Sequence, residues 1–429
     1  MTSAVWLLVA LIFLLLLGVS AGFGLGVTGL GYFAVTRGFE NIPFEIIAQR
    51  LVGTIDSFTL LAIPLFLFVG HVMNESGATT RLFAFASALV GHWRGGLAQV
   101  NVLASMLFAG MSGSGTADAA GLGAIELKAM REAKYDDRTS IGVTVGSALI
   151  GPIIPPSIAA IIYSVLAEVS PRDVLLAGAI PGVLMAVSMM LLVAYLARRR
   201  NLPSEPFPGW RRLATSFLRA FWALLTPFIL IGGILAGLFT ATESAAVASF
   251  WAVLVALLFY REMGLKALGR VFWKSAFDSA IIMFILACSG LFAWILTRAR
   301  LPQTIADGIA GITTDPTLVM ALIAVFLVVV GCFMAVAVSL NILTPILVPI
   351  VVGLGIDPVH FGVIMIMLLV IGEATPPFGM VLFVMTRIAN VPFDFVVRAA
   401  WPFLCAIFVV VLLVWLVPGL ALWLPAMAR

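Results

Sequence analysis

Apolar stretches long enough to cross a membrane follow one another along almost the entire chain. A transmembrane helix needs about 20 predominantly apolar residues. The candidate stretches are 4–19, 58–75, 96–112, 140–166, 174–197, 220–239, 243–260, 279–297, 317–334, 339–353, 361–386 and 399–424. They lack the period-two alternation of membrane-barrel strands. With 62% hydrophobic and 10% charged residues, the composition lies outside the range of soluble globular proteins. The sequence therefore predicts an all-α polytopic membrane protein.

Two of these stretches are interrupted by a pair of prolines. The first contains GPIIPPS at residues 151–157, and the second contains GEATPPF at residues 372–378. Proline lacks an amide hydrogen and clashes with the preceding turn, so each motif should break its helix. At membrane depth, freed backbone groups are tolerated only where they line a polar cavity or bind an ion. Each break is therefore expected to form part of a binding site.

The two proline motifs belong to a longer repeat at an offset of 221 residues. The matching residues are all glycine, proline or aspartate, which are types that end or cap helices. They are Asp136 with Asp357, Gly151 with Gly372, Pro155 with Pro376, Pro156 with Pro377, Pro171 with Pro392, Asp173 with Asp394 and Pro181 with Pro402. Seven such coincidences at one offset indicate an internal duplication.

The distribution of positive charge indicates that the two halves are inverted. Segment 126–138 carries four Lys and Arg residues, whereas its counterpart 347–360 carries none, and positive residues favour the cytoplasmic side. An inverted trace places five segments inside, which hold 18 of the 24 Lys and Arg residues: 76–96, 126–138, 198–219, 261–277 and 387–398. Inverted repeats with matching broken helices are typical of secondary transporters, whose sites lie near the bilayer midplane.

A second interruption precedes the first broken helix. MSGSGTADAAGLG, at residues 111–123, predicts a hairpin with its tip inside the protein, where Ser112, Ser114, Thr116 and Asp118 offer oxygen atoms. Small residues also permit close helix packing, but packing does not account for the clustered hydroxyls, so we favour a site for a hard cation such as Na⁺. Two interpretations of Asp118 stay open. An intramembrane carboxylate is a functional candidate, and an aspartate near a helix N-terminus can also cap it.

The corresponding region of the second half is more apolar. GCFMAVAVSLNILTP, at residues 331–345, offers Ser339, Asn341 and Thr344. Glu373, inside the second proline motif, is a candidate proton carrier or ion ligand. The three histidines do not cluster and are interpreted as interfacial residues.

Sequence motifs of enzymes and primary pumps are missing. Neither His-Glu-x-x-His, Gly-x-Ser-x-Gly nor Gly-x-x-x-x-Gly-Lys-Ser/Thr occurs, and no basic run indicates nucleic acid binding. We therefore predict no enzymatic activity, no cofactor, and no metal other than a coupling Na⁺.

Six blocks of the chain resemble the large membrane subunit, DctM-like, of tripartite ATP-independent periplasmic (TRAP) transporters. They are AIPLFLFVGHVMNESG, HWRGGLAQVNVLASMLFAGMSGSGTADAAGLGAI, IGPIIPPS, GGILAGLFTATESAAVA, LTPILVPIVVGLGIDPVHFGVIM and TPPFGMVLFV. The resemblance implies a multi-pass inner-membrane subunit that imports small organic anions, carboxylates above all, with a sodium gradient. It also implies a small four-helix membrane subunit and a periplasmic substrate-binding protein as partners, with membrane lipid around the chain.

The same resemblance implies an elevator-type fold, in which a scaffold surrounds a transport domain with two re-entrant hairpins. The expected division is 1–55 as N-terminal scaffold helices, 56–197 as the first inverted repeat, 198–277 as the connecting loop and scaffold helices, and 278–429 as the second inverted repeat. The expected hairpins cover about 97–125 and 317–353, and the broken helices about 139–166 and 361–386.

Site residues are likewise implied by the resemblance. Sodium is expected at Ser112, Gly113, Ser114, Gly151 and Pro155 in the first half and at Gly331, Gly372 and Thr375 in the second. Substrate is expected against the tips, at Ser112, Ser114, Thr116, Asp118 and Asn341.

Two residues depart from the family pattern. Ala335 stands where many members have aspartate. Many members also have an acidic residue before the glycine of the second proline motif, whereas in this chain the acidic residue, Glu373, follows that glycine. Glu373 leaves a proton-coupled variant as one alternative, and a stand-alone ion-coupled elevator transporter is the other.

Overall fold

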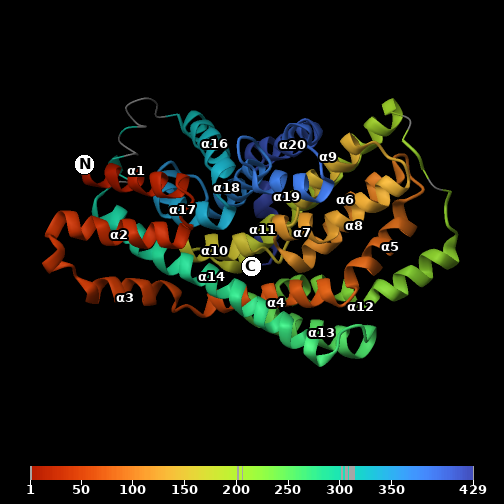
Figure 1. Cartoon of the computed structure of the whole chain (residues 1–429), viewed down its shortest axis with the longest axis horizontal. Helices are drawn as coiled ribbons and strands as arrows, with labels where there is room; N and C mark the ends of the chain where they lie inside the picture. Colours follow the sequence, from red (N-terminus) through yellow and green to blue (C-terminus); the bar gives the residue numbers. More distant parts are fainter. Residues whose placement is uncertain are drawn as a thin grey trace.

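The protein is described by a computed structural model that covers residues 2–200, 202–204, 206–300, 303–304, 308 and 315–428. Across this part of the chain every regular element is helical, which confirms the predicted all-α fold (Figure 1). The first half contains α1 (Thr2–Leu16), α2 (Ala21–Arg37), α3 (Phe44–Ile55), α4 (Ala62–Glu75), α5 (Ala78–Val90), α6 (Gly96–Ser112), α7 (Gly115–Ala120), α8 (Leu122–Glu132), α9 (Asp137–Ala148), α10 (Ile158–Leu166) and α11 (Pro171–Arg200).

The second half contains ten further helical elements among the described residues. They are α12 (Trp210–Leu235), α13 (Ala241–Leu254), the π-helical η3 (Val255–Tyr260), α14 (Leu265–Arg298), α16 (Pro316–Phe333), α17 (Val336–Gly353), α18 (Pro358–Glu373), α19 (Met380–Ala389), α20 (Phe393–Leu416) and α21 (Gly419–Met427). Two short 3₁₀ segments, Phe39–Asn41 and Phe58–Leu61, flank α3.

Eight helical stretches of the described chain are long and apolar enough to cross a membrane. They are Phe58–Glu75, Pro171–Arg200, Trp210–Leu235, Ala241–Tyr260, Leu265–Arg298, Pro316–Phe333, Val336–Gly353 and Phe393–Leu416. Shorter apolar helices account for two of the other four predicted stretches, 96–112 by α6 and 361–386 by α18 and α19. This confirms a polytopic membrane protein with several apolar segments that do not span by themselves.

Both proline motifs break their helices, as predicted. The first broken helix consists of α9 and α10, which are separated by residues 149–157. Ser157 ends this break, because its hydroxyl accepts a hydrogen bond from the Ala160 amide at 3.0 Å and so caps α10. The second consists of α18 and α19, separated by residues 374–379.

The two broken helices lie in the middle of the molecule. Every residue from Thr139 to Ala148 in α9, and from Val359 to Glu373 in α18, is buried. A helix that is buried on all sides belongs to the core of a large protein. In Figure 1, α7, α10 and α18 occupy the centre, α2 and α3 lie towards one end, and α5 and the start of α12 lie towards the other. The first break is therefore enclosed by protein, whereas Pro377 and Phe378 of the second break are exposed.

Residues matched by the 221-residue offset have similar local roles in both halves. Asp136 caps α9 by accepting from the Thr139 amide, and Asp357 caps α18 by accepting from the Val359 amide. Pro181 and Pro402 both lie inside long helices, α11 and α20. The inverted orientation of the halves stays a prediction.

In each predicted hairpin the helix is interrupted. In the first, α6 ends at Ser112, Gly113 adopts a φ of +64°, and α7 begins at Gly115. In the second, only Met334 and Ala335 separate α16 from α17. The re-entrant course of the two pairs, and the division into scaffold and transport domain, stay predictions.

The predicted inside segment 261–277 is largely helical, because α14 runs without a break through most of it. Lys266, Arg270 and Lys274 recur every four residues, so they share one face of a helix instead of ending it. Similarly, α5 fills most of segment 76–96. Positive charge indicates the side of the membrane on which a segment lies, and does not indicate that the segment is unstructured.

Candidate functional site

The connection between α6 and α7, from Ser112 to Asp118, is called the first tip. Asp118 lies in it and is almost completely buried. It belongs to the short helix α7, and only 1% of its surface is exposed. Its Oδ1 accepts a hydrogen bond from the Ser112 hydroxyl, at the end of α6. Its Oδ2 has no hydrogen-bond partner among the described residues. Within the same residues Asp118 accepts no backbone amide, and α7 has no side-chain cap. The capping interpretation is therefore wrong.

Asp118 faces the break of the first broken helix. A side chain added at Gly151 would collide with Asp118 Oδ2, so that oxygen lies directly against the Gly151 backbone. A side chain at Gly113 would likewise meet the Pro156 carbonyl oxygen, and one at Gly115 would meet the Ala148 carbonyl oxygen at 2.8 Å. The absence of side chains therefore lets the tip approach the freed carbonyls of the break.

The first tip combines the chemical groups that a hard cation binds. Hydroxyl, carboxylate and carbonyl oxygens are ligands of this kind, and the tip supplies all three from Ser112, Asp118 and the break. Ser114 and Thr116 add two hydroxyls that lie 3.3 Å apart. The unpartnered, buried Oδ2 of Asp118 fits such an ion, because a buried carboxylate oxygen without a partner is costly. The structure thus brings Ser112, Ser114, Asp118 and Gly151 together, with Gly113 against the Pro156 carbonyl.

The connection between α16 and α17, at Met334 and Ala335, is called the second tip. A different carboxylate holds it to the second break. Glu373, 6% exposed, comes from the end of α18, and its Oε1 accepts from the Val336 amide at the start of α17 at 2.9 Å. The Gly379 amide donates to the Cys332 carbonyl at 3.1 Å. Thr375 uses its hydroxyl within its own segment, donating to the Ile371 carbonyl at 2.8 Å.

Gly331 and Gly372 are in close backbone contact. A side chain at Gly331 would come within 2.6 Å of the Leu369 carbonyl oxygen and 3.0 Å of Gly372 Cα. A side chain at Gly372 would come within 2.5 Å of Gly331 Cα. The predicted second-half residues Gly331, Gly372 and Thr375 therefore lie at one junction between α16, α18 and the second break.

Asn341 uses its side-chain amide in hydrogen bonds to α14 and to its own helix. Its Oδ1 accepts from Ser289 of α14 at 2.8 Å, and its Nδ2 donates to the Ala337 carbonyl at 2.6 Å. No hydrogen bond among the described residues joins Asn341 to Ser112, Ser114 or Asp118. The structure therefore does not unite all the predicted substrate residues in one hydrogen-bonded group.

A buried polar group next to the first tip was missed by sequence reasoning. Glu126 is 1% exposed, Ser105 donates to its Oε1 at 3.3 Å, and its Oε2 is unpartnered within the described chain. Asn101 donates to Thr144 at 2.7 Å. The spacing of Asn101 and Ser105, four residues apart in an apolar run, was the available signal, because it places both on one helix face.

A contact between distant histidine and aspartate residues was also missed. His71 Nε2 of α4 lies 2.9 Å from Asp278 Oδ2 of α14. The interpretation of this histidine as merely interfacial overlooked its partner. Groups of three or more His, Cys, Asp or Glu side chains able to hold a metal ion do not occur in the described ranges.

Comparisons with known proteins agree with the architecture of the chain. Residues 8–420 match the family described as the tripartite ATP-independent periplasmic transporter, DctM component. The sialic acid TRAP transporter large permease protein SiaM of Vibrio cholerae is 40% identical over 412 residues, which cover 96% of each chain. The C4-dicarboxylate TRAP transporter large permease protein DctM of Pseudomonas aeruginosa is 38% identical over 387 residues, 90% of this chain and 91% of that protein.

A solved structure shares the fold at low sequence identity. The YdaH transporter of Alcanivorax borkumensis superposes with a TM-score of 0.65 and 14% identity, covering 97% of this chain and 98% of that one.

Proposed function

This chain belongs to the DctM component family of tripartite ATP-independent periplasmic transporters, and we propose that it moves small organic anions into the cell in symport with sodium. Members of this family are transport permeases and not enzymes. The chain is accordingly a multi-pass protein of the bacterial inner membrane. The sodium coupling, the substrate class and the mechanism are the parts that we propose.

The sodium proposal rests on the Oδ2 atom of Asp118. This atom has no hydrogen-bond partner among the described residues and lies against the Gly151 backbone. A buried carboxylate oxygen without a donor is stabilised by a cation, and carbonyl oxygens of the break lie beside it. We assign this ion to Ser112, Gly113, Ser114, Gly151 and Pro155, with Asp118 contributing its charge. A second sodium is assigned to the junction of Gly331, Gly372 and Thr375.

The substrate is proposed to bind between the two tips. The relatives are named for sialic acid and C4-dicarboxylates, and both compounds carry carboxylates. Ser114 and Thr116 present hydroxyls that can donate to such a group, because neither is engaged with a carboxylate among the described residues. Sodium bound beside these hydroxyls would lower the cost of placing an anion there, so ion and substrate would bind with positive coupling.

Alternating access is proposed to occur by movement of the tips and broken helices against the surrounding helices. The packing supports such a unit, since α7 contacts α19 and α10 contacts α17, which joins elements of both halves. The hydrogen bond between Ser289 and Asn341 crosses from α14 to α17. It would be one of the contacts that changes during the movement.

Two partners follow from the tripartite family. We propose a small membrane subunit and a periplasmic substrate-binding protein, and the latter would select much of the substrate.

Reconstitution tests the proposal. The chain, its small subunit and its binding protein are placed in proteoliposomes, and uptake of labelled sialic acid and C4-dicarboxylates is measured with and without an inward sodium gradient. We expect uptake that requires both sodium and the binding protein. Uptake without the binding protein would favour a stand-alone transporter, and uptake driven only by protons would favour the proton-coupled alternative. Asp394→Asn, at an exposed position in α20, is a matched control for Asp118→Asn.

A further inference from the structure

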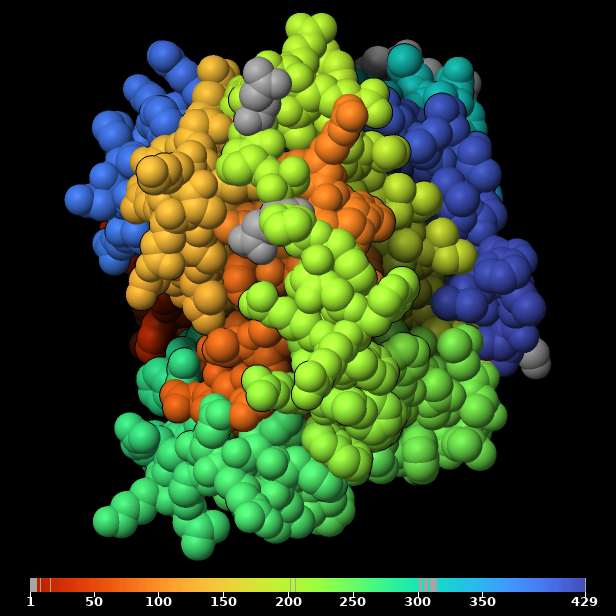
Figure 2. All heavy atoms as spheres, turned by 90° about the vertical axis from the view of Figure 1, so that its right-hand side faces the viewer, coloured from red at the N-terminus to blue at the C-terminus, as the bar shows by residue number. Residues whose placement is uncertain are grey.

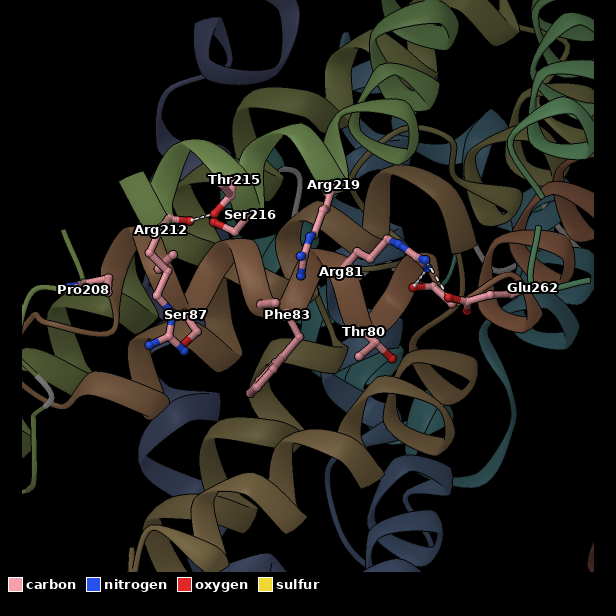
Figure 3. A pocket seen from close by; sticks show the side chains of 13 residues that line it. Thr80, Arg81, Phe83, Ser87, Pro208, Arg212, Thr215, Ser216, Arg219 and Glu262 are labelled. Atoms are coloured by element: carbon pink, nitrogen blue, oxygen red, sulfur yellow. Dashed lines mark hydrogen bonds and ion pairs between the residues drawn. The ribbon is translucent and has the colours of Figure 1, made fainter. Parts of the chain in front are cut away.

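Three segments that the charge distribution places on the cytoplasmic side meet around one cavity. Its volume is about 750 Å³, and it is lined by residues of α5, by residues of α12 with the preceding Pro208, and by Glu262 (Figure 3). These residues come from the predicted inside segments 76–96, 198–219 and 261–277. Figure 2 shows the orange α5 region beside the yellow-green start of α12 on this face. The cavity is distinct from the tips and breaks described above.

The two helices contribute different walls to this cavity. On α12, Arg212, Ser216 and Arg219 are spaced by about one turn and therefore share a face. Figure 3 shows both arginine side chains directed from α12 towards α5. On α5, the lining includes the small residues Ala84, Ser87 and Ala88 beside the larger Phe83. The small residues leave space for a ligand next to the arginines.

The charge in the cavity is not balanced. Arg81 is engaged, because it pairs with Glu262 at 2.5 Å and stacks 4.0 Å over the Tyr260 ring. The guanidinium groups of Arg212 and Arg219 have no hydrogen-bond or ion-pair partner among the described residues. Three arginines and a single carboxylate line the cavity. It therefore offers two free cations beside the Ser87 and Ser216 hydroxyls.

The surroundings indicate the depth of the cavity in the membrane. Trp210, 78% exposed, and Phe217, 41% exposed, lie on the same turns of α12 as the cations. Aromatic side chains of this kind gather at the headgroup level. The cytoplasmic leaflet carries the anionic lipids, and basic pockets between helices on that side bind their headgroups.

We propose that this cavity binds the phosphate of an anionic glycerophospholipid from the cytoplasmic leaflet. Arg212 and Arg219 donate to the phosphate oxygens, which suits guanidinium geometry, and the hydroxyl of Ser87 adds a further donor. The acyl chains run along the exposed apolar surface of Phe217 and Leu218, which is 64% exposed. Since α5 packs against α6, the helix that ends at the first tip, the lipid would hold this helix pair against α12.

Lipid titration of the purified chain in neutral detergent tests the proposal. Dioctanoyl phosphatidylglycerol is titrated, with dioctanoyl phosphatidylcholine and inorganic phosphate as comparison ligands, and binding is measured by native mass spectrometry and by the shift in melting temperature. We expect phosphatidylglycerol to bind more tightly than the other two. Removing a cation should weaken binding about fivefold per arginine, so Arg212→Gln/Arg219→Gln should lose about thirtyfold.

A matched control removes two arginines outside the cavity. Arg211→Gln/Arg270→Gln deletes the same charge at exposed positions of α12 and α14 and should bind like the unaltered chain. Equal losses in both double variants, or no preference for phosphatidylglycerol over phosphatidylcholine, would overturn the proposal. Equally strong binding of inorganic phosphate would assign the cavity to a free anion and overturn the lipid assignment.

A second variant keeps the test decisive if the double arginine variant fails to fold. Ala84→Leu fills the α5 wall and leaves every arginine in place. It should weaken phosphatidylglycerol binding at least tenfold, and unchanged binding would contradict the proposed location.

Discussion

The backbone amide of Val336 donates a hydrogen bond of 2.9 Å to Oε1 of Glu373, and this contact joins the second tip to the second broken helix. The N-cap residue of α17 is Ala335, which has no side-chain acceptor. A carboxylate from another element thus takes the place of a cap. In the first half the carboxylate belongs to the tip, where Asp118 reaches Gly151. Each tip therefore contacts its break through one carboxylate. In the first half the tip supplies this carboxylate, and in the second half the broken helix supplies it.

Removing the Glu373 carboxylate should destabilise the second tip. In Glu373→Ala the buried Val336 amide loses its acceptor, which costs about 1–3 kcal/mol. Adding Ala335→Asp should recover about 1 kcal/mol, because an N-cap aspartate accepts from nearby amides and places negative charge at the same helix end. Thermal unfolding in detergent measures both changes. Ala335→Leu in the same background adds a side chain without an acceptor and should recover nothing.

Replacing Glu373 by glutamine separates its structural role from a role in proton transfer. The glutamine Oε1 can still accept from Val336, so stability should change by less than about 1 kcal/mol. If Glu373 carries a proton during transport, Glu373→Gln should abolish any dependence of uptake on a pH gradient while sodium-driven uptake persists. Uptake rates over a series of external pH values provide the measurement. Identical profiles for both proteins would exclude proton coupling through this residue.

Asp118→Asn should reduce the response of the protein to sodium. At sodium concentrations a hundredfold above Kd, each bound ion stabilises the folded state by about 2.7 kcal/mol. The melting temperature should therefore rise when Na⁺ replaces K⁺ at constant ionic strength, and Asp118→Asn should keep only the part of this rise that the second sodium site contributes. Asp394→Asn should keep the whole rise. A rise in Asp118→Asn equal to that of the unaltered protein would remove Asp118 from the proposed site.

A methyl group at Gly331 should disrupt the second junction. In Gly331→Ala the new Cβ would lie 2.6 Å from the Leu369 carbonyl oxygen, and such overpacking costs about 1–3 kcal/mol. Gly353→Ala is the control with the opposite expected sign. Nothing lies within 4 Å of a Cβ at Gly353, and alanine is the better helix former by about 1 kcal/mol. Equal melting temperatures for the two variants would contradict the close contact.

The local features of this fold were predictable from sequence, whereas its long-range contacts were not. Proline pairs and glycines act on the backbone within a few residues, so the breaks after Ala148 and Glu373 were located in advance. The predicted stretch 279–297 covers only part of α14, because the charged residues before it interrupt the apolar run. The contacts of Ser289 with Asn341 and of His71 with Asp278 join residues 52 and 207 positions apart, and no local pattern encodes such pairings.

The candidate site divides in the same way. Ser112 and Asp118 lie six residues apart, and their proximity follows from a tight turn. The placement of Gly151 against Asp118 depends on how α6, α7 and α9 pack, which requires the whole structure. Glu126 was missed because it lies at the start of the charged segment 126–138, where a carboxylate is expected to be exposed.

The contact between Gly331 and Gly372 has a mechanical consequence. With no side chain between the two backbones, α16 and α18 interlock at this point and cannot slide along each other without a clash. Displacement of α18 must then carry α16 with it. The freedom to bend is left to the two residues between α16 and α17 and to the segment between α18 and α19. The second half therefore moves as one rigid unit with two flexible connections. Stiffening either connection should slow the conformational cycle without altering the binding of ion or substrate.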